Sequence, residues 1–391
     1  MASPLVWKSL DNFATLFHYC WPCPFHWDKA NGRFTSTRSP ILLIPWTIVV
    51  FQMTPILSVF CTSIILLTIY GTISPPLTSL FMCSIINTLL FLSISIELVW
   101  YLHNEPTKVC FGYLIQIVKR EPKREQTKKI DPIGIFLNIT VAMFAVYPYF
   151  LIPFLLYFEF DPTFMFAKYV LSLTLNTSLD QILFNTVRLL QFLVALQICR
   201  LFPLLVCTLM FGVLIILDTV KTLDMWVVLI KFSQNKAAAQ IRRYIELTLV
   251  MQVCAGFSDA SIAILMGLGL ILCVLFNFVT LKLYNIIPMP LYLYFPSVAI
   301  IIPFIIDTLL PLGIRVNEKT ARLKTKWGKQ LDLCSDRKYL QRRLRAIKPL
   351  RFDCRVAGYN LLQLVKPTKA WFYMQIMNYT ISALLFKTNP S

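Results

Sequence analysis

The sequence predicts an all-α membrane protein. We expect seven transmembrane helices, an N-terminus inside, a C-terminus outside and long cytoplasmic helical extensions. Three observations lead to this prediction: an apolar composition, a series of long apolar runs, and basic residues that are dense in some segments and sparse in the segments between.

The composition is that of a membrane protein. The 391 residues are 57% hydrophobic and 14% charged, whereas soluble domains carry about 25% charged residues. Disordered chains need low hydrophobicity, so they are excluded too. The net charge of +18 would suggest a nucleic-acid partner in a soluble protein. Here the basic residues lie between apolar runs, as in cytoplasmic loops, so the expected surroundings are a lipid bilayer and no nucleic acid.

Seven apolar runs are candidates for membrane spans, each of which needs about 20 residues. The first carries Pro45 and Pro55 and is long enough to tilt or kink, and the seventh is short. The runs are approximately 41–70, 77–102, 133–158, 201–217, 260–281, 291–314 and 370–386.

The orientation follows from the distribution of Lys and Arg. The segments 1–40, 103–132, 218–259 and 315–369 hold 32 of the 37 basic residues. Because cytoplasmic loops carry the excess of Lys and Arg, these segments are predicted to be inside. The glycosylation sequon at Asn176 then falls in an outer loop. The protein is expected to be a multi-pass protein of the plasma membrane.

The chain divides into four parts by these criteria. Residues 1–40 form a cytoplasmic N-terminal segment, 41–314 a six-helix bundle, 315–369 a basic cytoplasmic anchor, and 370–391 the seventh helix with an outside tail. The inner segments have helical patterns at 108–130, at 218–259 as one continuous helix, and at 318–348.

Few residues suggest catalysis or metal binding. The chain has three His and none of the HExxH, GxSxG, Walker or GxGxxG motifs, so neither an enzyme nor a cofactor is expected. His18, Cys20, Cys23 and His26 have the chemistry of zinc ligands, but their spacing is too tight for a zinc finger. An interfacial segment rich in aromatic residues and Cys is the preferred interpretation.

Four charged residues lie in or beside the apolar runs. Glu97 and Asp307 are inside spans, and Arg188 and Arg200 flank the fourth. Such residues either make functional contacts or extend their side chains to the interface. Positions near span ends favour the second reading for Glu97 and Arg200, while both readings stay open for Asp307.

Aromatic residues gather toward the outer halves of the third and sixth spans. They are predicted either to line an apolar pocket for a small ligand or to form an interfacial belt. The candidate pocket residues are Tyr147, Tyr149, Phe150, Tyr292 and Tyr294.

The seventh span has an unusual number of polar residues for a helix that faces lipid. Tyr379, Ser382, Leu385 and Phe386 are spaced so that they share one helical stripe. If copies of this helix meet around an axis, the stripe lines a pore. Leu385 and Phe386 then form an apolar constriction that blocks ions by dewetting.

The last span resembles the terminal motif of arthropod gustatory receptors, which is Thr-Tyr, five hydrophobic residues and then Gln-Phe. Tyr379 and Phe386 match this motif at the right separation, while Asn378 stands for Thr and Leu385 for Gln. The seven spans, inside N-terminus, short last helix and long inner helices also resemble this insect-type gustatory and odorant receptor family.

The resemblance implies a ligand-gated, poorly selective cation channel of four subunits, as a homotetramer or heterotetramer. The last helix would line the pore, with Phe386 as the gate residue and Leu385 beside it. The inner helices would form an intracellular anchor, and the outer bundle would hold a small tastant or odorant. Because Leu385 replaces the Gln of the motif, the ion selectivity and conductance that the resemblance implies do not carry over directly to this chain.

Two other classes of membrane protein remain as alternatives. A non-channel receptor coupled to G proteins would need its N-terminus outside, and the chain lacks Asp-Arg-Tyr after the third span. A small-molecule transporter would be expected to show paired interrupted helices in its two halves, which the sequence does not show.

The predicted orientation has a direct test. An epitope tag at the N-terminus should be hidden from antibody on intact cells, because the first 40 residues are basic and remain inside. A tag at the C-terminus should be accessible. Accessibility of both tags from the same side would require an even number of spans and remove the pore assigned to the seventh helix.

Overall fold

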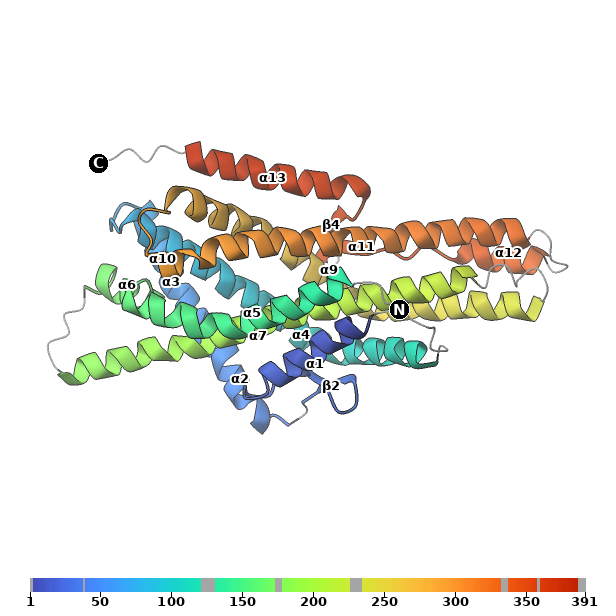
Figure 1. Ribbon diagram of the computed structural model, residues 1–391, viewed down its shortest axis with the longest axis horizontal. Helices are drawn as coiled ribbons and strands as arrows, with labels where there is room; N and C mark the ends of the chain where they lie inside the picture. The colour runs from blue at the N-terminus through green and yellow to red at the C-terminus, as the bar shows by residue number, and fades with distance from the viewer. Residues whose placement is uncertain are drawn as a thin grey trace.

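The computed structural model describes residues 3–37, 39–120, 131–172, 178–225, 234–331, 337–356 and 359–385. Its long helices run close to the longest axis of an elongated bundle (Figure 1). They are α4 (Leu77–Arg120), α5 (Pro132–Tyr157), α7 (Ser178–Met225), α9 (Gln234–Lys282), α11 (Tyr294–Leu331) and α13 (Lys366–Leu385). Shorter helices are α1 (Pro4–Leu16), α2 (Ile44–Ile48), α3 (Thr54–Ile69), α6 (Pro162–Tyr169), α10 (Met289–Tyr292) and α12 (Arg337–Ala346).

The first predicted span is a continuous helical segment from Ile41 to Ile69. Pro45 lies at the start of α2, where its missing N–H is not needed. Pro55 follows a π-helical turn, η2 (Val49–Met53). The ring of a proline crowds the carbonyl four residues earlier, and a wider turn at that point relieves the clash.

Six helical segments are long and apolar enough to cross a membrane, and they contain the first six predicted spans. They are Ile41–Ile69, Leu77–Lys119, Pro132–Tyr169, Ser178–Met225, Ala237–Lys282 and Tyr294–Gln330. α13 forms a helix over the predicted seventh run, but it is not among these six. Its polar residues lower its mean hydropathy, so a seventh span stays a prediction.

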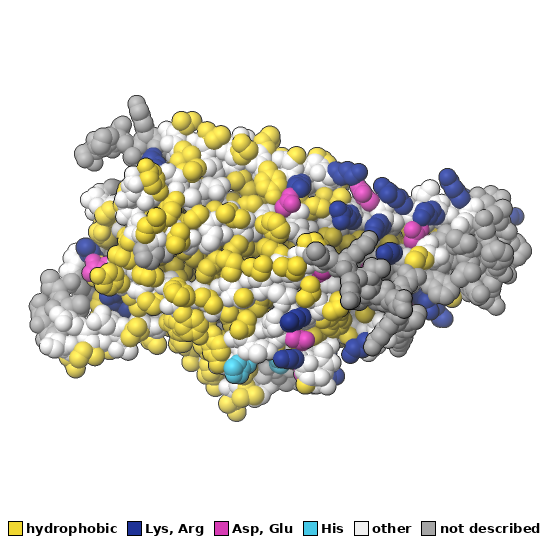
Figure 2. Space-filling view, viewed as in Figure 1, with side chains coloured by type: hydrophobic (Ala, Val, Ile, Leu, Met, Phe, Trp, Pro, Cys, Tyr) yellow, Lys and Arg dark blue, Asp and Glu magenta, His cyan; other side chains and the backbone are white. Residues whose placement is uncertain are grey.

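The helices continue well beyond the predicted spans at one end of the molecule. α4 extends to Arg120 and α11 to Leu331, and α12 packs beside α11. Figure 2 shows Lys and Arg gathered toward this end, over α11 and α12, while hydrophobic side chains cover most of the rest of the visible face. The predicted long helical extensions are therefore present, and they form the basic end of the bundle.

The single continuous helix predicted over 218–259 is wrong. α7 ends at Met225, α9 begins at Gln234, and the two run in opposite directions (Figure 1). Spans on either side of one cytoplasmic segment require the chain to turn back within it. The apolar positions at helical spacing therefore belong to two helices.

The N-terminal segment packs into the bundle. Ser3 caps the start of α1, where its hydroxyl accepts from the backbone N–H of Val6, and α1 buries Val6, Leu10 and Phe13 against α5 and α7. The antiparallel hairpin of β1 (Phe25–Asp28) and β2 (Arg33–Ser36) follows, with Trp27 opposite Phe34. Both aromatic side chains are buried.

A second hairpin joins α12 to α13. Its strands are β3 (Asp353–Val356) and β4 (Tyr359–Gln363), and β3 packs against α9. The two hairpins correct the all-α prediction: the protein is mostly helical, with two short antiparallel hairpins among its described residues. Strands of four or five residues give too weak a period-two pattern to be seen beside apolar runs of 20 residues.

α4 kinks at His103, whose backbone angles are φ −112° and ψ 18°. The cause is Pro106, because a proline ring clashes with the carbonyl four residues earlier. The His103 ring lies against the backbone of α9 at Gly256. A Cβ added there would be 2.5 Å from Nε2 of His103, so only glycine permits this approach.

This contact predicts a stability difference between two glycines. Gly256→Ala should lower the free energy of unfolding by roughly 1–3 kcal/mol through overpacking, measured as a lower melting temperature in detergent. Gly112→Ala in α4 is the control, since a Cβ there meets nothing within 4 Å. Adding His103→Ala to Gly256→Ala should recover part of the loss. Equal melting temperatures of Gly256→Ala and Gly112→Ala would contradict the contact between His103 and Gly256.

Candidate functional site

α13 is attached to the rest of the chain along one narrow stripe. Phe372, Ile376 and Thr380 are buried and spaced four residues apart, so they lie on one face of the helix. This face packs against α9 and, to a lesser extent, α11.

Three polar contacts fix α13 to α11 at the start of the helix. Lys369 forms an ion pair with Asp307, and Lys366 forms another with Glu318 at 3.0 Å. The Tyr373 hydroxyl donates to the carbonyl of Pro303 at 3.1 Å. Asp307, one of the two predicted intramembrane charges, is thus a half-exposed partner of the C-terminal helix.

The opposite face of α13 is not covered by the residues that the structure describes. Tyr379, Ser382 and Leu385, the described members of the predicted stripe, are exposed, and Leu385 is 76% accessible. Trp371, Met374, Met377 and Asn378 extend the same surface. Phe386 lies outside the described residues. The uncovered face therefore combines large apolar side chains with an amide and two hydroxyls.

The junction between β4 and α13 is held by local hydrogen bonds. The Thr368 hydroxyl accepts from the backbone N–H of Val365 at 3.1 Å and donates to the carbonyl of Gln363 at 3.0 Å. On β3, Arg355 forms ion pairs with Asp353 and, at 3.7 Å, with Asp259 of α9. The hairpin and the first turn of α13 are therefore fixed to each other and to α9.

The structure brings together only part of the predicted aromatic pocket. The Tyr147 hydroxyl lies 2.9 Å from Oγ of Ser297, and its ring meets that of Tyr294 with centroids 5.3 Å apart. The Tyr292 hydroxyl donates to the carbonyl of Thr280 at 2.9 Å. The remaining two residues, Tyr149 and Phe150, are exposed on the surface of α5.

Glu97 is 2% exposed, so the expectation that it extends to the interface is wrong. Its carboxylate accepts from Nε1 of Trp46 at 3.2 Å and from the side-chain amide of Gln197. Arg200 is also buried, and it donates to the carbonyl of Trp21 at 2.6 Å. The physical reason is that the N-terminal segment and α2 cover this part of α4 and α7 and supply the partners that keep both groups inside.

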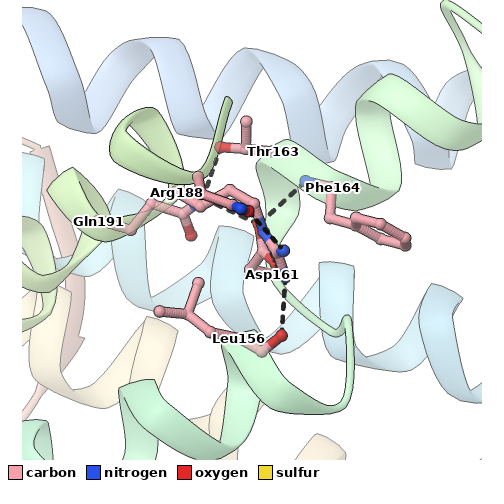
Figure 3. A network of polar contacts seen from close by, with 7 residues as sticks. Leu156, Asp161, Thr163, Phe164, Arg188 and Gln191 are labelled. Carbon is pink, nitrogen blue, oxygen red and sulfur yellow. Dashed lines mark hydrogen bonds and ion pairs between the residues drawn. The ribbon is translucent and has the colours of Figure 1, made fainter. Parts of the chain in front are cut away.

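A second buried charge cluster fixes the turn between α5 and α6 to α7 (Figure 3). Asp161, which caps α6 at the N–H of Phe164, receives two hydrogen bonds from Arg188 at 2.9 and 2.6 Å. Gln191 donates to the same carboxylate at 3.1 Å, and Arg188 also reaches the carbonyl of Leu156. Arg188, for which the sequence left open a functional contact or a side chain extended to the interface, is thus a structural ion-pair partner.

Sequence reasoning missed several of these residues. Asp161 had a readable signal, since Asp-Pro before an apolar stretch is typical of a helix start. Gln191 and Gln197 had none, because their partners are about 30 and 100 positions away. Among the described residues, no group of three or more His, Cys, Asp or Glu side chains could hold a metal ion.

The comparisons with known proteins find a likeness in fold. No family model and no curated protein matches the chain. The solved structure of the insect olfactory receptor OR5 from Machilis hrabei in complex with eugenol is similar, with a TM-score of 0.59 and 12% identity over 98% of this chain and 99% of that one. Another structure of the same receptor has a TM-score of 0.53, at 12% identity over 97% and 98% of the two chains. The chain therefore has the fold of an insect olfactory receptor over nearly its full length.

The Asp161 cluster predicts a large cost for losing its cation. Arg188→Met should lower the free energy of unfolding by roughly 3–5 kcal/mol, because the carboxylate of Asp161, 1% exposed, loses its counter-charge. Adding Asp161→Asn should recover part of this loss.

The matched control is Lys326→Met, which breaks an exposed ion pair with Asp224 and should cost less than about 1 kcal/mol. Thermal unfolding of the four proteins in detergent measures both effects. If Arg188→Met and Lys326→Met melt alike, the cluster does not hold the turn between α5 and α6.

Proposed function

We propose that this chain is a subunit of a ligand-gated, poorly selective cation channel of the insect-type odorant and gustatory receptor family. The observation that carries the proposal is the packing of α13. One side of this helix packs against α9 and α11, and the described residues leave its opposite face uncovered. The likeness in fold to an insect olfactory receptor supports it.

The proposed orientation puts the basic end of the bundle in the cytoplasm. This end is built by the extensions of α4, α7, α9 and α11 together with α12, and Figure 2 supports it by the gathering of Lys and Arg there. α13 then crosses the membrane as a seventh helix toward an outside C-terminus. Residues 315–369 serve as the anchor and 41–314 as the six-helix bundle.

The proposed pore is formed where the uncovered faces of four copies of α13 meet. A helix that lines an aqueous path tolerates Asn378 and Ser382, which lipid would not. Tyr379 and Ser382 supply polar groups to the path, and Leu385 and Phe386 supply the apolar constriction near its outer end. The partner subunits are identical copies or related chains.

A small tastant or odorant is proposed to bind in the outer half of the bundle, near the contact between Tyr147 and Tyr294. Two tyrosine rings, a hydroxyl pair with Ser297 and mostly apolar surroundings are typical of a site for a small, mainly apolar molecule. Ligand binding opens the pore only by its difference in affinity for the open and closed states.

The pore assignment predicts the effect of two substitutions. Phe386→Ala should raise the resting current of expressing cells, because a smaller side chain widens the apolar constriction. Leu385→Gln should also raise it, since an amide lets water remain at the constriction.

Leu361→Gln on β4 is the control, because it makes the same change at an exposed leucine outside α13. Whole-cell recording with matched surface expression measures the currents. Resting and ligand-evoked currents that are unchanged in both α13 variants would contradict the pore assignment.

A further inference from the structure

An apolar cavity of about 60 Å³ lies in the core between α4, α7, α9 and α11. Its position differs from that of the aromatic pair proposed above, since its α4 residues, Cys110 to Leu114, come after the kink at His103. The cavity is thus on the side of the basic extensions. Phe352 and Leu364, which flank the second hairpin, close it on one side.

The cavity has a distinctive lining. Four sulfur-containing side chains contribute to it, namely Cys110, Met251, Cys254 and Met266. Sulfur is polarizable and packs well against varied apolar shapes. A wall of this kind suits a compact apolar molecule better than a charged or strongly polar one.

One polar group in the wall is unsatisfied. Thr208 is 0% exposed, and its Oγ1 has no hydrogen-bond partner among the described residues. A buried hydroxyl without a partner costs free energy, and a ligand oxygen that accepts from it would remove that cost. The cavity therefore offers one hydrogen bond in apolar surroundings.

The volume limits the ligand. A single water needs roughly 10–15 Å³ of such space, and a cavity of about 150 Å³ holds benzene. The cavity of about 60 Å³ has less than half of that volume, so it fits a molecule well below the size of benzene, of roughly two to three non-hydrogen atoms.

The cavity also contacts the segment that leads into α13. A Cβ added at Gly313 of α11 would lie 3.6 Å from Leu364 and 3.8 Å from Phe352, so the cavity wall and the hairpin are in direct contact. Leu364 is two residues before the start of α13. A molecule in the cavity would therefore act on the hairpin and, through it, on the position of α13.

We propose that this cavity is a second small-molecule site, which takes a compact volatile with an apolar body and one hydrogen-bond acceptor, such as acetonitrile. Its occupation biases α13 through Phe352 and Leu364. The effect on α13 rests on the channel function proposed above, whereas the binding itself does not.

The test measures binding of acetonitrile to the purified full-length protein in detergent, by saturation-transfer NMR titration. We expect a saturable signal. Thr208→Val should weaken binding about fivefold, because the hydrogen bond is lost, while Thr208→Ser, which keeps the hydroxyl, should retain most of it. Gly313→Ala should weaken binding about fourfold, because its methyl group occupies the cavity without a clash.

Gly267→Ala is the matched control, since a Cβ there meets nothing within 4 Å and the residue is exposed on α9. Absence of saturable binding, or equal binding by the Gly313 and Gly267 variants, would overturn the proposal. Binding is read without any current, so a protein that binds acetonitrile but does not conduct refutes only the channel function.

Discussion

The burial of α7 is the constraint on which the rest of the fold depends. In its most apolar stretch 89% of the residues are buried within the single chain, against 39–56% for the other five membrane-spanning candidates. In a bilayer an apolar helix can be covered by lipid or by protein, and α7 is the candidate span that protein covers most completely. α1, α4, α5, α9 and α11 each pack against it, and this arrangement leaves α13 on the outside of the bundle.

The sequence was most informative where one physical requirement dominates. Crossing a hydrocarbon layer demands about 20 apolar residues, and the first six spans followed from that requirement alone. The basic segments likewise predicted which helices extend into a charged end. The two hairpins could not be found in this way, because short strands such as 25–28 and 353–356 carry no signal of comparable strength.

Individual contacts were harder to predict than spans. Tyr147 and Tyr149 are two residues apart, yet one contacts Tyr294 and the other faces outward. Positions separated by two residues point to nearly opposite sides of a helix, and the rotation of α5 is set by packing rather than by composition. Glu97 and Arg200 were misjudged because their partners come from the N-terminal segment, far away in the sequence. That Tyr379, Ser382 and Leu385 share one side of α13 could be predicted from the sequence, because it depends only on spacing along one helix.

The uncovered face of α13 has a consequence for the stability of a single chain that has no partner subunits. Under the channel function proposed above, α13 crosses the membrane, and in a chain without partner subunits Asn378 and Ser382 would face hydrocarbon, where unsatisfied polar groups are costly. An unassembled copy is then less stable than an assembled one, and mass action links the amount of well-folded protein to the supply of partners. Under that proposal, any chain with a compatible last helix would serve as a partner, so this surface would decide which subunits are retained together.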